Sequence, residues 1–464
     1  MSDVATLEEE VTAGDGSDEP VRPPMPRAFR QLLLNTLATG VTSSFLWFAL
    51  TFWVYVETRS VVTTGVIGGA YSVSSALLSP FIGTYVDRHR KRRVLLVLTA
   101  LALACFTVAT AVYAIVGPVD LLRLTSPFFW LLVATTLLGS VAAASRGIAL
   151  STCVTLLVAE GSRDRANGMV GTVAGISFAI TSVFSGLVIG FLGMGWAYIG
   201  ALVLVAVALL HMSTIHFDEP APAPPPDDGQ RQKSFDVRTA VDAIRGVPGL
   251  RMLIFLAAFN NLLAGVFMAL IDPYGLELVS VETWGFIWGG ISTSFIVGGL
   301  IVAKRGLGRH PLRLVLAGNL VNWAVCSVFA IRSSIVLMTI GMIVWLALIP
   351  IIEAAEQTIL QRAIPFEKQG RVFGFAQMIE NAAAPVTAFM MAPIAETVFM
   401  PTMTDGRGAD LIGDWFGTGP ARGIALMFTL AGVLGIIVTA LVWSSKSYRR
   451  LSAAASDVEP ATAG

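Results

Sequence analysis

Long apolar runs separated by short polar segments dominate the chain. Each run reaches roughly the 20 residues that a helix needs to cross a bilayer. A backbone inside hydrocarbon must satisfy its own hydrogen bonds, so runs of this length predict helices. The pattern predicts an all-α membrane protein with about twelve transmembrane helices, near residues 30–56, 62–86, 94–117, 127–158, 166–191, 195–214, 249–279, 282–303, 312–331, 334–361, 370–399 and 421–444.

One long polar segment divides these runs into two groups of six. It holds five prolines between Pro220 and Pro226, followed by acidic and basic residues, which is typical of an aqueous linker. We expect a short surface helix at its end, from Val237 to Arg245. The predicted organisation is a disordered cytosolic tail (1–29), an N-terminal six-helix half (30–214), a cytoplasmic linker (215–248), a C-terminal six-helix half (249–445) and a cytosolic tail (446–464).

Composition supports a membrane protein. Hydrophobic residues make up 55% and charged residues 13% of the chain, whereas soluble domains carry about a quarter charged residues. Cys105, Cys153 and Cys326 are isolated in apolar runs, and no two histidines have the i,i+4 spacing of a helical metal site. We therefore expect no metal, no nucleic-acid partner and no enzyme activity, because no nucleophile–base constellation appears.

Lysine and arginine follow the alternation of the loops. With both termini on the inside, roughly 25 of the 31 fall on that side. The exceptions are Arg146 within a run and an outer set, namely Arg59, Arg123, Arg332, Arg407 and Arg422. Basic residues are costly to translocate and mark the cytoplasmic side. The bias predicts a multi-pass protein of the cell (plasma or inner) membrane with both termini in the cytoplasm.

The segment from Gly83 to Leu95 combines one acid with five basic residues between two apolar runs. Asp87 ends the preceding predicted helix, where the helix dipole is negative, so a lone carboxylate there is disfavoured. It needs a partner, such as an arginine or the N-terminus of another helix. Gly83, one turn earlier, allows close approach of a neighbouring helix.

This segment resembles the loop between helices 2 and 3 of the major facilitator superfamily, whose pattern is G-x-x-x-D-R/K-x-G-x-R/K-R/K. The matching residues are Gly83, Asp87, Arg88, Arg92 and Arg93, while Arg90 replaces the second glycine. Gly299 to Gly306 is a weaker second copy, with Ala303 at the position of Asp87. The resemblance implies two six-helix pseudo-repeat halves that alternate access to a central site, with Asp87 docking near Gly370 and Arg371 as a cytoplasmic latch.

Three further segments resemble the drug:proton antiporter branch of that superfamily, which includes macrolide-efflux-type and siderophore exporters. They are Arg165 to Gly168, Gln357 to Arg362 followed by Gly370 to Phe373, and Arg422 to Leu426. The chain departs from that branch at Thr135, where many drug exporters carry arginine, and it lacks their span-five proline. The resemblance implies proton motive force as the energy source, with no other cofactor.

Several charges lie within the apolar runs, where each costs about 2.5–3.5 kcal/mol. They are candidates for proton coupling: Asp272, Glu353, Glu356, Glu380 and Arg146. Glu380 follows Arg371 by about 9 residues, or ~14 Å along a helix, near the middle of the bilayer core. The alternative interpretation is that the acids and Arg146 form ion pairs that hold the halves together.

Candidates for lining a substrate cavity are Gln377 and Asn381, which flank Glu380, and the aromatic pair Trp47 and Phe48. Aromatic residues in spans also face lipid or the interface, which is the alternative for this pair. We expect a secondary active transporter, a monomer whose partners are a small molecule, protons and the bilayer, most simply a proton-coupled exporter of small amphipathic compounds or drugs. Alternatives are a proton-coupled importer of a small metabolite and a receptor or assembly factor that keeps the fold without transport.

Overall fold

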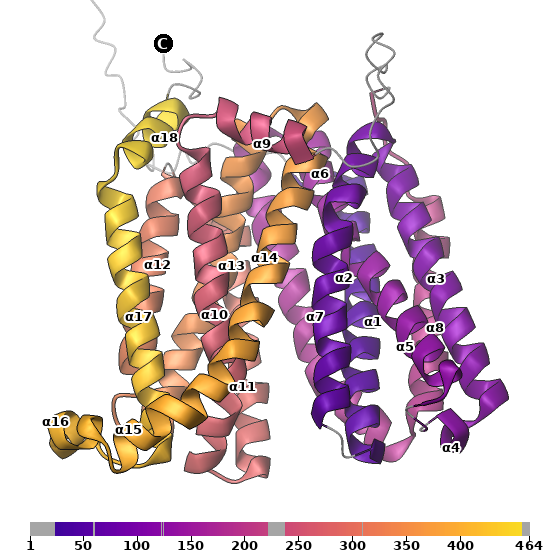
Figure 1. The fold of residues 1–464 in the computed structure, drawn as a ribbon. Helices are drawn as coiled ribbons and strands as arrows, with labels where there is room; N and C mark the ends of the chain where they lie inside the picture. Colours follow the sequence, from indigo (N-terminus) through magenta and orange to yellow (C-terminus); the bar gives the residue numbers. More distant parts are fainter. Residues whose placement is uncertain are drawn as a thin grey trace, which may run out of the picture.

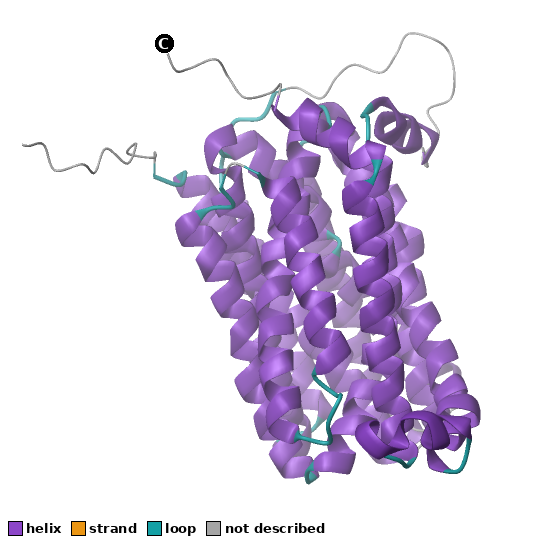
Figure 2. Ribbon diagram, turned by 90° about the vertical axis from the view of Figure 1, so that its left-hand side faces the viewer, coloured by secondary structure: helices purple, strands orange, loops and turns teal. Residues whose placement is uncertain are grey.

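The computed structural model describes residues 24–58, 61–121, 123, 125–220, 237–308 and 310–456. These residues form helices and loops, with no strand among them (Figure 2). Within them, 12 helical stretches are long and apolar enough to cross a membrane, which confirms the predicted fold class. The helices are α1 (Arg27–Thr58), α2 (Val61–Arg88), α3 (Lys91–Val116), α4 (Pro118–Leu121), α5 (Pro127–Ala144), α6 (Arg146–Leu157), η1 (Glu160–Ser162), α7 (Arg163–Phe191), α8 (Met194–Thr214), α9 (Val237–Gly246), α10 (Leu250–Leu278), α11 (Val281–Arg305), α12 (Pro311–Val328), α13 (Ile335–Ala363), α14 (Phe366–Ile394), η2 (Ala395–Phe399), α15 (Met400–Thr404), α16 (Arg407–Phe416), α17 (Pro420–Ser444) and α18 (Lys446–Ser456).

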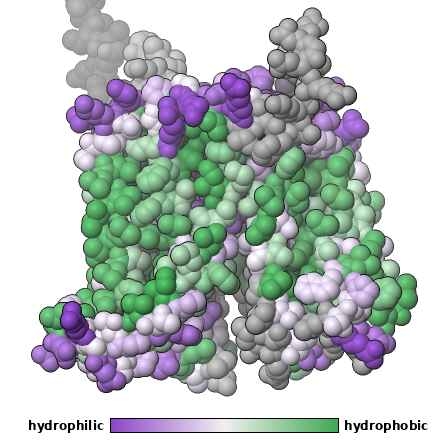
Figure 3. All heavy atoms as spheres, in the orientation of Figure 1, coloured by the Kyte–Doolittle hydropathy of each residue, from purple (hydrophilic) through white to green (hydrophobic). Residues whose placement is uncertain are grey.

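The helices form two bundles that lie side by side, α1–α8 in one half and α10–α17 in the other (Figure 1). The halves meet where α2 packs against α14 and where α7 packs against α11. On the face shown in Figure 3, a band of apolar side chains lies between two polar ends, as expected for a bundle with lipid around its middle.

Both ends of the described chain lie at the same end of the bundle. Phe29, near the start of α1, packs against Val154 and Val158 at the end of α6. The helices α9 and α18 lie at this upper end, whereas α15 and α16 lie at the lower end (Figure 1). At the lower end the surface is hollowed between the two halves (Figure 3).

The fourth and eleventh spans are irregular. The fourth is broken at Ser145, which separates α5 from α6. The eleventh is longer than the predicted 370–399, because α14 continues through the π-helix η2 into α15, giving a stretch of 39 residues. Pro385 and Pro393 lie inside α14 and each removes a backbone donor, which accounts for the bend of its lower part in Figure 1.

The tails and the linker differ in part from expectation. Helix α1 begins at Arg27, within the segment that the sequence assigns to the N-terminal tail. Within the segment assigned to the C-terminal cytosolic tail, residues 446–456 form α18, and Leu451 of this helix is buried against Gly249. Helix α9 agrees with the short helix expected from Val237 to Arg245, and buries Ala240 and Ile244. The predicted tail over 1–23 and the proline-rich 221–236 lie outside the described residues.

Candidate functional site

The two halves approach each other closely where α2 crosses α14, and glycines make this approach possible. A Cβ on Gly83 would overlap the carbonyl oxygen of Gly370. A Cβ on Gly374 would lie 2.5 Å from the Ser79 carbonyl oxygen, which is equally too close. Only hydrogen side chains fit here, so the backbones of the two helices are in direct contact.

This contact brings Asp87, at the end of α2, to the beginning of α14. Its Oδ1 accepts a hydrogen bond from the Gly370 backbone nitrogen (2.6 Å), and its Oδ2 accepts one from that of Arg371 (3.0 Å). The Arg371 guanidinium adds an ion pair, with Nε 3.7 Å from Oδ2, and the Asp87 side chain is 2% exposed. The negative end of α2 disfavours the carboxylate, whereas the positive N-terminus of α14 stabilises it. The contact predicted from the sequence is therefore present.

The basic residues that follow Asp87 differ in their contacts and in their exposure. Arg92 donates to the backbone oxygens of Ser213 and Ile215, both at 2.7 Å, and so caps the end of α8. Lys91 was not singled out by the sequence, yet its Nζ donates to the Val86 oxygen (2.9 Å) and lies 4.9 Å from the ring centre of Phe366, at the start of α14. Lys91 thus joins the Asp87 contact between the halves. Arg93 is exposed and Arg88 is half-buried.

A second contact between the halves joins α7 to α11. A Cβ on Gly168 would lie 2.5 Å from the Ala303 nitrogen, so these backbones also touch. Here the acid comes from the opposite helix, since Asp164 accepts a hydrogen bond from the Leu307 nitrogen (2.9 Å). Arg165 donates to the backbone oxygen of Lys304. Asp164 therefore plays, at this crossing, the part that Asp87 plays at the first, where the repeat has Ala303.

A buried amide network lies beside the second contact. The Asn167 side-chain nitrogen donates to Thr358 Oγ1 and Gln361 Oε1, both at 2.9 Å, and thereby links α7 to α13. Gln361 in turn donates to the Ser151 oxygen of α6 (3.1 Å), and its own backbone oxygen accepts from Gln369 of α14 (3.1 Å). Two sequence segments that resemble the exporter branch thus contact each other across the halves, which their separation of 194 residues conceals in the sequence.

A cavity of about 380 Å³ lies between the halves, below this network. Asn167 belongs both to the network and to the cavity wall, so the network closes the upper end of the cavity. The lining comes from α6 and α7 on one side and from α13 and α14 on the other. It comprises Gly147, Ile148, Leu150, Ser151, Val154, Asn167, Val170, Gly171, Ala174, Pro350, Glu353, Ala354, Glu356, Gln357, Phe373, Ala376, Gln377 and Glu380.

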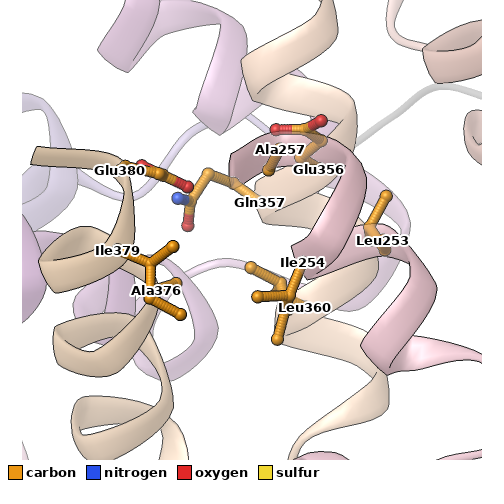
Figure 4. A pocket seen from close by; sticks show the side chains of 9 residues that line it. All are labelled: Leu253, Ile254, Ala257, Glu356, Gln357, Leu360, Ala376, Ile379 and Glu380. Carbon is orange, nitrogen blue, oxygen red and sulfur yellow. The ribbon is translucent and has the colours of Figure 1, made fainter. Parts of the chain in front are cut away.

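Three of the predicted coupling acids meet at this cavity: Glu353, Glu356 and Glu380. Glu356 is close enough to the other two for their negative charges to repel. Glu353 lies deep in the bundle but is exposed, because it faces the cavity. None of the three forms an ion pair or hydrogen bond with a described residue. A smaller space next to the cavity lies between α10, α13 and α14, where Glu380 and Gln357 point toward each other (Figure 4).

The predicted substrate-cavity residues are divided between several places. Gln377 lines the cavity. Asn381 donates to Ser75 Oγ of α2 (2.9 Å), so it bridges the halves. Trp47 packs against Phe48 and, at a ring distance of 5.3 Å, against Tyr71 within the N-terminal half. Neither Trp47 nor Phe48 lines the cavity among the described residues, and their role in binding stays a prediction.

Arg146 and Asp272 lie apart from the three acids. Arg146, the first residue of α6, is buried and donates to Asn35 Oδ1 of α1, while its Nε and Nη1 have no hydrogen-bond partner among the described residues. Asp272 of α10 accepts hydrogen bonds from the indole nitrogens of Trp284 (3.0 Å) and Trp288 (2.9 Å) of α11. Asp272 therefore stabilises the packing of α10 on α11 toward the lower end, and its part in coupling stays a prediction.

Arg422, which the sequence places on the outer side, is buried, and the sequence did not indicate its partners. It lies at the start of α17 and is 3% exposed. Its guanidinium donates to the backbone oxygens of Ala330 and Ile331 beyond the end of α12, and it stacks on the Phe416 ring of α16 at 4.2 Å. This buried cation fixes the lower end of the C-terminal half.

Two six-helix bundles around a central cavity, held together at one end by paired helix crossings, are the architecture of many secondary transporters. The sequence matches the Major Facilitator Superfamily over residues 32–388, and the chain belongs to this family. No curated protein sequence matches the chain significantly.

Solved structures show the same fold. The human organic anion transporter MFSD10 (TETRAN) is 14% identical, with a TM-score of 0.61, over 90% of this chain and 100% of that one. A bacterial homologue of the iron transporter ferroportin, in the outward-facing state with soaked iron, is also 14% identical over the same shares, with a TM-score of 0.67. A second structure of that homologue in the outward-facing state, likewise 14% identical over the same shares, has a TM-score of 0.65. At these identities the similarity concerns the fold.

Proposed function

We propose that this protein is a proton-coupled secondary transporter that exports small amphipathic compounds by alternating access. The observation that carries the proposal is the central cavity, which combines three carboxyl groups without a basic partner and an apolar wall. Carboxyl groups can carry protons, and the apolar wall can hold the body of a substrate.

The two crossings at the upper end act as the cytoplasmic gate. Asp87 with Gly370 and Arg371 closes one side, and Asp164 with the Asn167 network closes the other. The upper end also carries α9, α18 and the basic segment after Asp87, which supports placing it in the cytoplasm of a cell-membrane protein. The conformation is then open toward the outside, in keeping with the hollow at the lower end (Figure 3).

Substrate is exchanged for protons because both compete for the same carboxyl groups. Protons from outside bind to Glu353, Glu356 and Glu380, neutralise their charges and so release the substrate. The protonated site then favours the state open to the cytoplasm, where protons leave and substrate binds. Each ligand must bind one state more tightly than the other, since otherwise it shifts no population. The protein works as a monomer in this scheme, because one chain supplies the cavity and both gates.

The proposal is tested with the purified protein in sealed proteoliposomes. A panel of dyes and antibiotics is presented with an imposed pH gradient, with and without an uncoupler. We expect accumulation against the concentration gradient that the uncoupler abolishes. Accumulation in the direction of proton flow would instead identify an importer, and the absence of proton-dependent transport across the panel would contradict the proposal.

A further inference from the structure

The cavity between the halves has two chemically different walls. The side formed by α6 and α7 contributes nine lining residues that carry no charge. The side formed by α13 and α14 contributes all three carboxyl groups, those of Glu353, Glu356 and Glu380. No lysine or arginine occurs among the described lining residues. A molecule inside therefore meets carboxyl groups on one side and an uncharged, mostly apolar surface on the other.

Unused hydrogen-bond acceptors lie on the charged side. The Oε1 atoms of Glu356, Gln357 and Gln377 are buried and have no hydrogen-bond partner among the described residues. Buried acceptors are almost always paired in folded proteins, because an unpaired one loses its bond to water without replacement. All three residues line the cavity, so a molecule that brings N–H groups to this wall would satisfy them.

We propose, building on the transport function above, that the substrate is a protonated organic amine or amidine with an apolar body and at least two N–H donors. The cationic end contacts Glu353, Glu356 and Glu380. The N–H groups donate to the buried acceptors, and the apolar body packs on α6 and α7. A cavity of about 380 Å³ is within the size range of sites for drug-sized molecules.

The same features disfavour other substrate classes. An anion would meet three carboxyl groups with no cation beside them. A quaternary ammonium has the charge but no N–H, so it would leave the acceptors unpaired. A bare divalent cation needs several oxygen ligands in close geometry, and no group of three or more candidate ligands for a metal ion occurs in the described parts of the chain.

Four fluorescent probes that share one dansyl body test the proposal on the purified full-length protein at neutral pH. They are dansylcadaverine, its trimethylammonium analogue, the analogue with a hydroxyl in place of the amine, and the analogue with a carboxylate. Binding is followed by the dansyl emission. We expect the amine to bind about tenfold or more tightly than each of the other three, since each lacks the charge, the donors or both.

Variants localise the effect. Glu356→Gln, Glu353→Gln and Glu380→Gln are each expected to reduce affinity for the amine by about tenfold and to leave the affinity for the hydroxyl analogue unchanged. Glu277→Gln is the matched control, because this glutamate is exposed on α10 and lies outside the cavity. If one variant fails to fold, the remaining variants and the four-probe comparison on the native protein decide whether the amine proposal holds.

The outcomes separate this proposal from the transport proposal. Equal binding of all four probes, preference for the carboxylate or the quaternary probe, or no saturable binding of the amine would overturn the amine assignment. Proton-driven transport of neutral or anionic compounds would overturn it too, while leaving the transport function intact. Selective binding of the amine without any proton-driven transport would support the site and contradict the transport function.

Discussion

The Asp87 carboxylate lies 2.6 Å from the Gly370 backbone nitrogen, across 283 residues of sequence. It is one carboxylate shared between two consecutive backbone donors, those of Gly370 and Arg371, at the first turns of α14. Hydrogen bonds to a charged group contribute about 1.5–3 kcal/mol, so this contact stabilises the packing of α2 on α14 appreciably. If the upper end opens during transport, as proposed above, these bonds must break. On that proposal the contact sets the balance between the two states, and substitutions there should change transport more than folding.

Asp87→Asn tests the gate with almost no change in shape. The side-chain amide can accept from one of the two backbone donors but presents its own N–H₂ to the other. We expect initial transport rates in proteoliposomes to fall about tenfold or more, with membrane expression near normal. Normal transport by this variant would remove the latch hypothesis. Lys304→Ala should be better tolerated than Arg88→Ala, since Lys304 contributes its backbone oxygen to the contact with Arg165 at the second crossing, and alanine keeps that oxygen.

Gly83→Ala tests close packing of α2 on α14. The added methyl group would overlap the Gly370 carbonyl, so the helices must move apart, at a cost typical of overpacking, about 1–3 kcal/mol. We expect a lower thermal midpoint in detergent and slower transport. Gly69→Ala on the same helix is the control, because nothing lies within 4 Å of its added Cβ. Equal effects of both substitutions would mean that helix propensity, rather than the crossing, decides the outcome.

Asn167→Leu tests the amide network. It leaves Gln361 and Thr358 without their partner, and an unpaired buried polar group costs about 1–3 kcal/mol. We expect a lower thermal midpoint for Asn167→Leu and for Gln361→Leu. The double variant should lose less than the sum, because neither side chain then strands the other. Strictly additive losses would show that the two amides do not stabilise each other.

Glu380→Gln tests coupling. Glutamine keeps the size of the side chain but cannot bind and release a proton, so a pH gradient can no longer do work through this position. We expect the substrate to exchange down its own gradient, while pH-driven accumulation falls by about tenfold or more. Glu353→Gln and Glu356→Gln are the comparison variants, because their carboxyl groups line the same cavity from α13. If either of them abolishes accumulation and Glu380→Gln does not, the coupling site lies on α13.

Reporter fusions test the orientation in the membrane. A reporter that is active only in the cytoplasm should work at the C-terminus, beyond α18, and within the linker at 220–232. It should be inactive when fused within 401–418, since α15 and α16 lie at the opposite end of the bundle (Figure 1). Activity at 401–418 would reverse the assignment of the cytoplasmic side.

The sequence was sufficient to predict the twelve helices, for a simple physical reason. In hydrocarbon each span must be a helix of bilayer length, so an apolar run is enough to define it. The contact of Asp87 could also be anticipated, since a carboxylate at the end of a helix needs a compensating partner. Helix α18 could not be anticipated, because it is stabilised by the burial of Leu451 against Gly249 rather than by its own composition.

Only the tertiary structure decided which polar side chains meet. Which face of a membrane helix points inward depends on how it packs against its neighbours, and the seams here are made by small residues such as Gly83 and Gly370, far apart in the chain. Because of that packing, Glu353, Glu356 and Glu380 all line one cavity, whereas Arg146 contacts Asn35 instead. It also places Asp164 at the crossing where Ala303 replaces the expected acid, and there the Asp164 carboxylate accepts from the Leu307 backbone nitrogen on the opposite side.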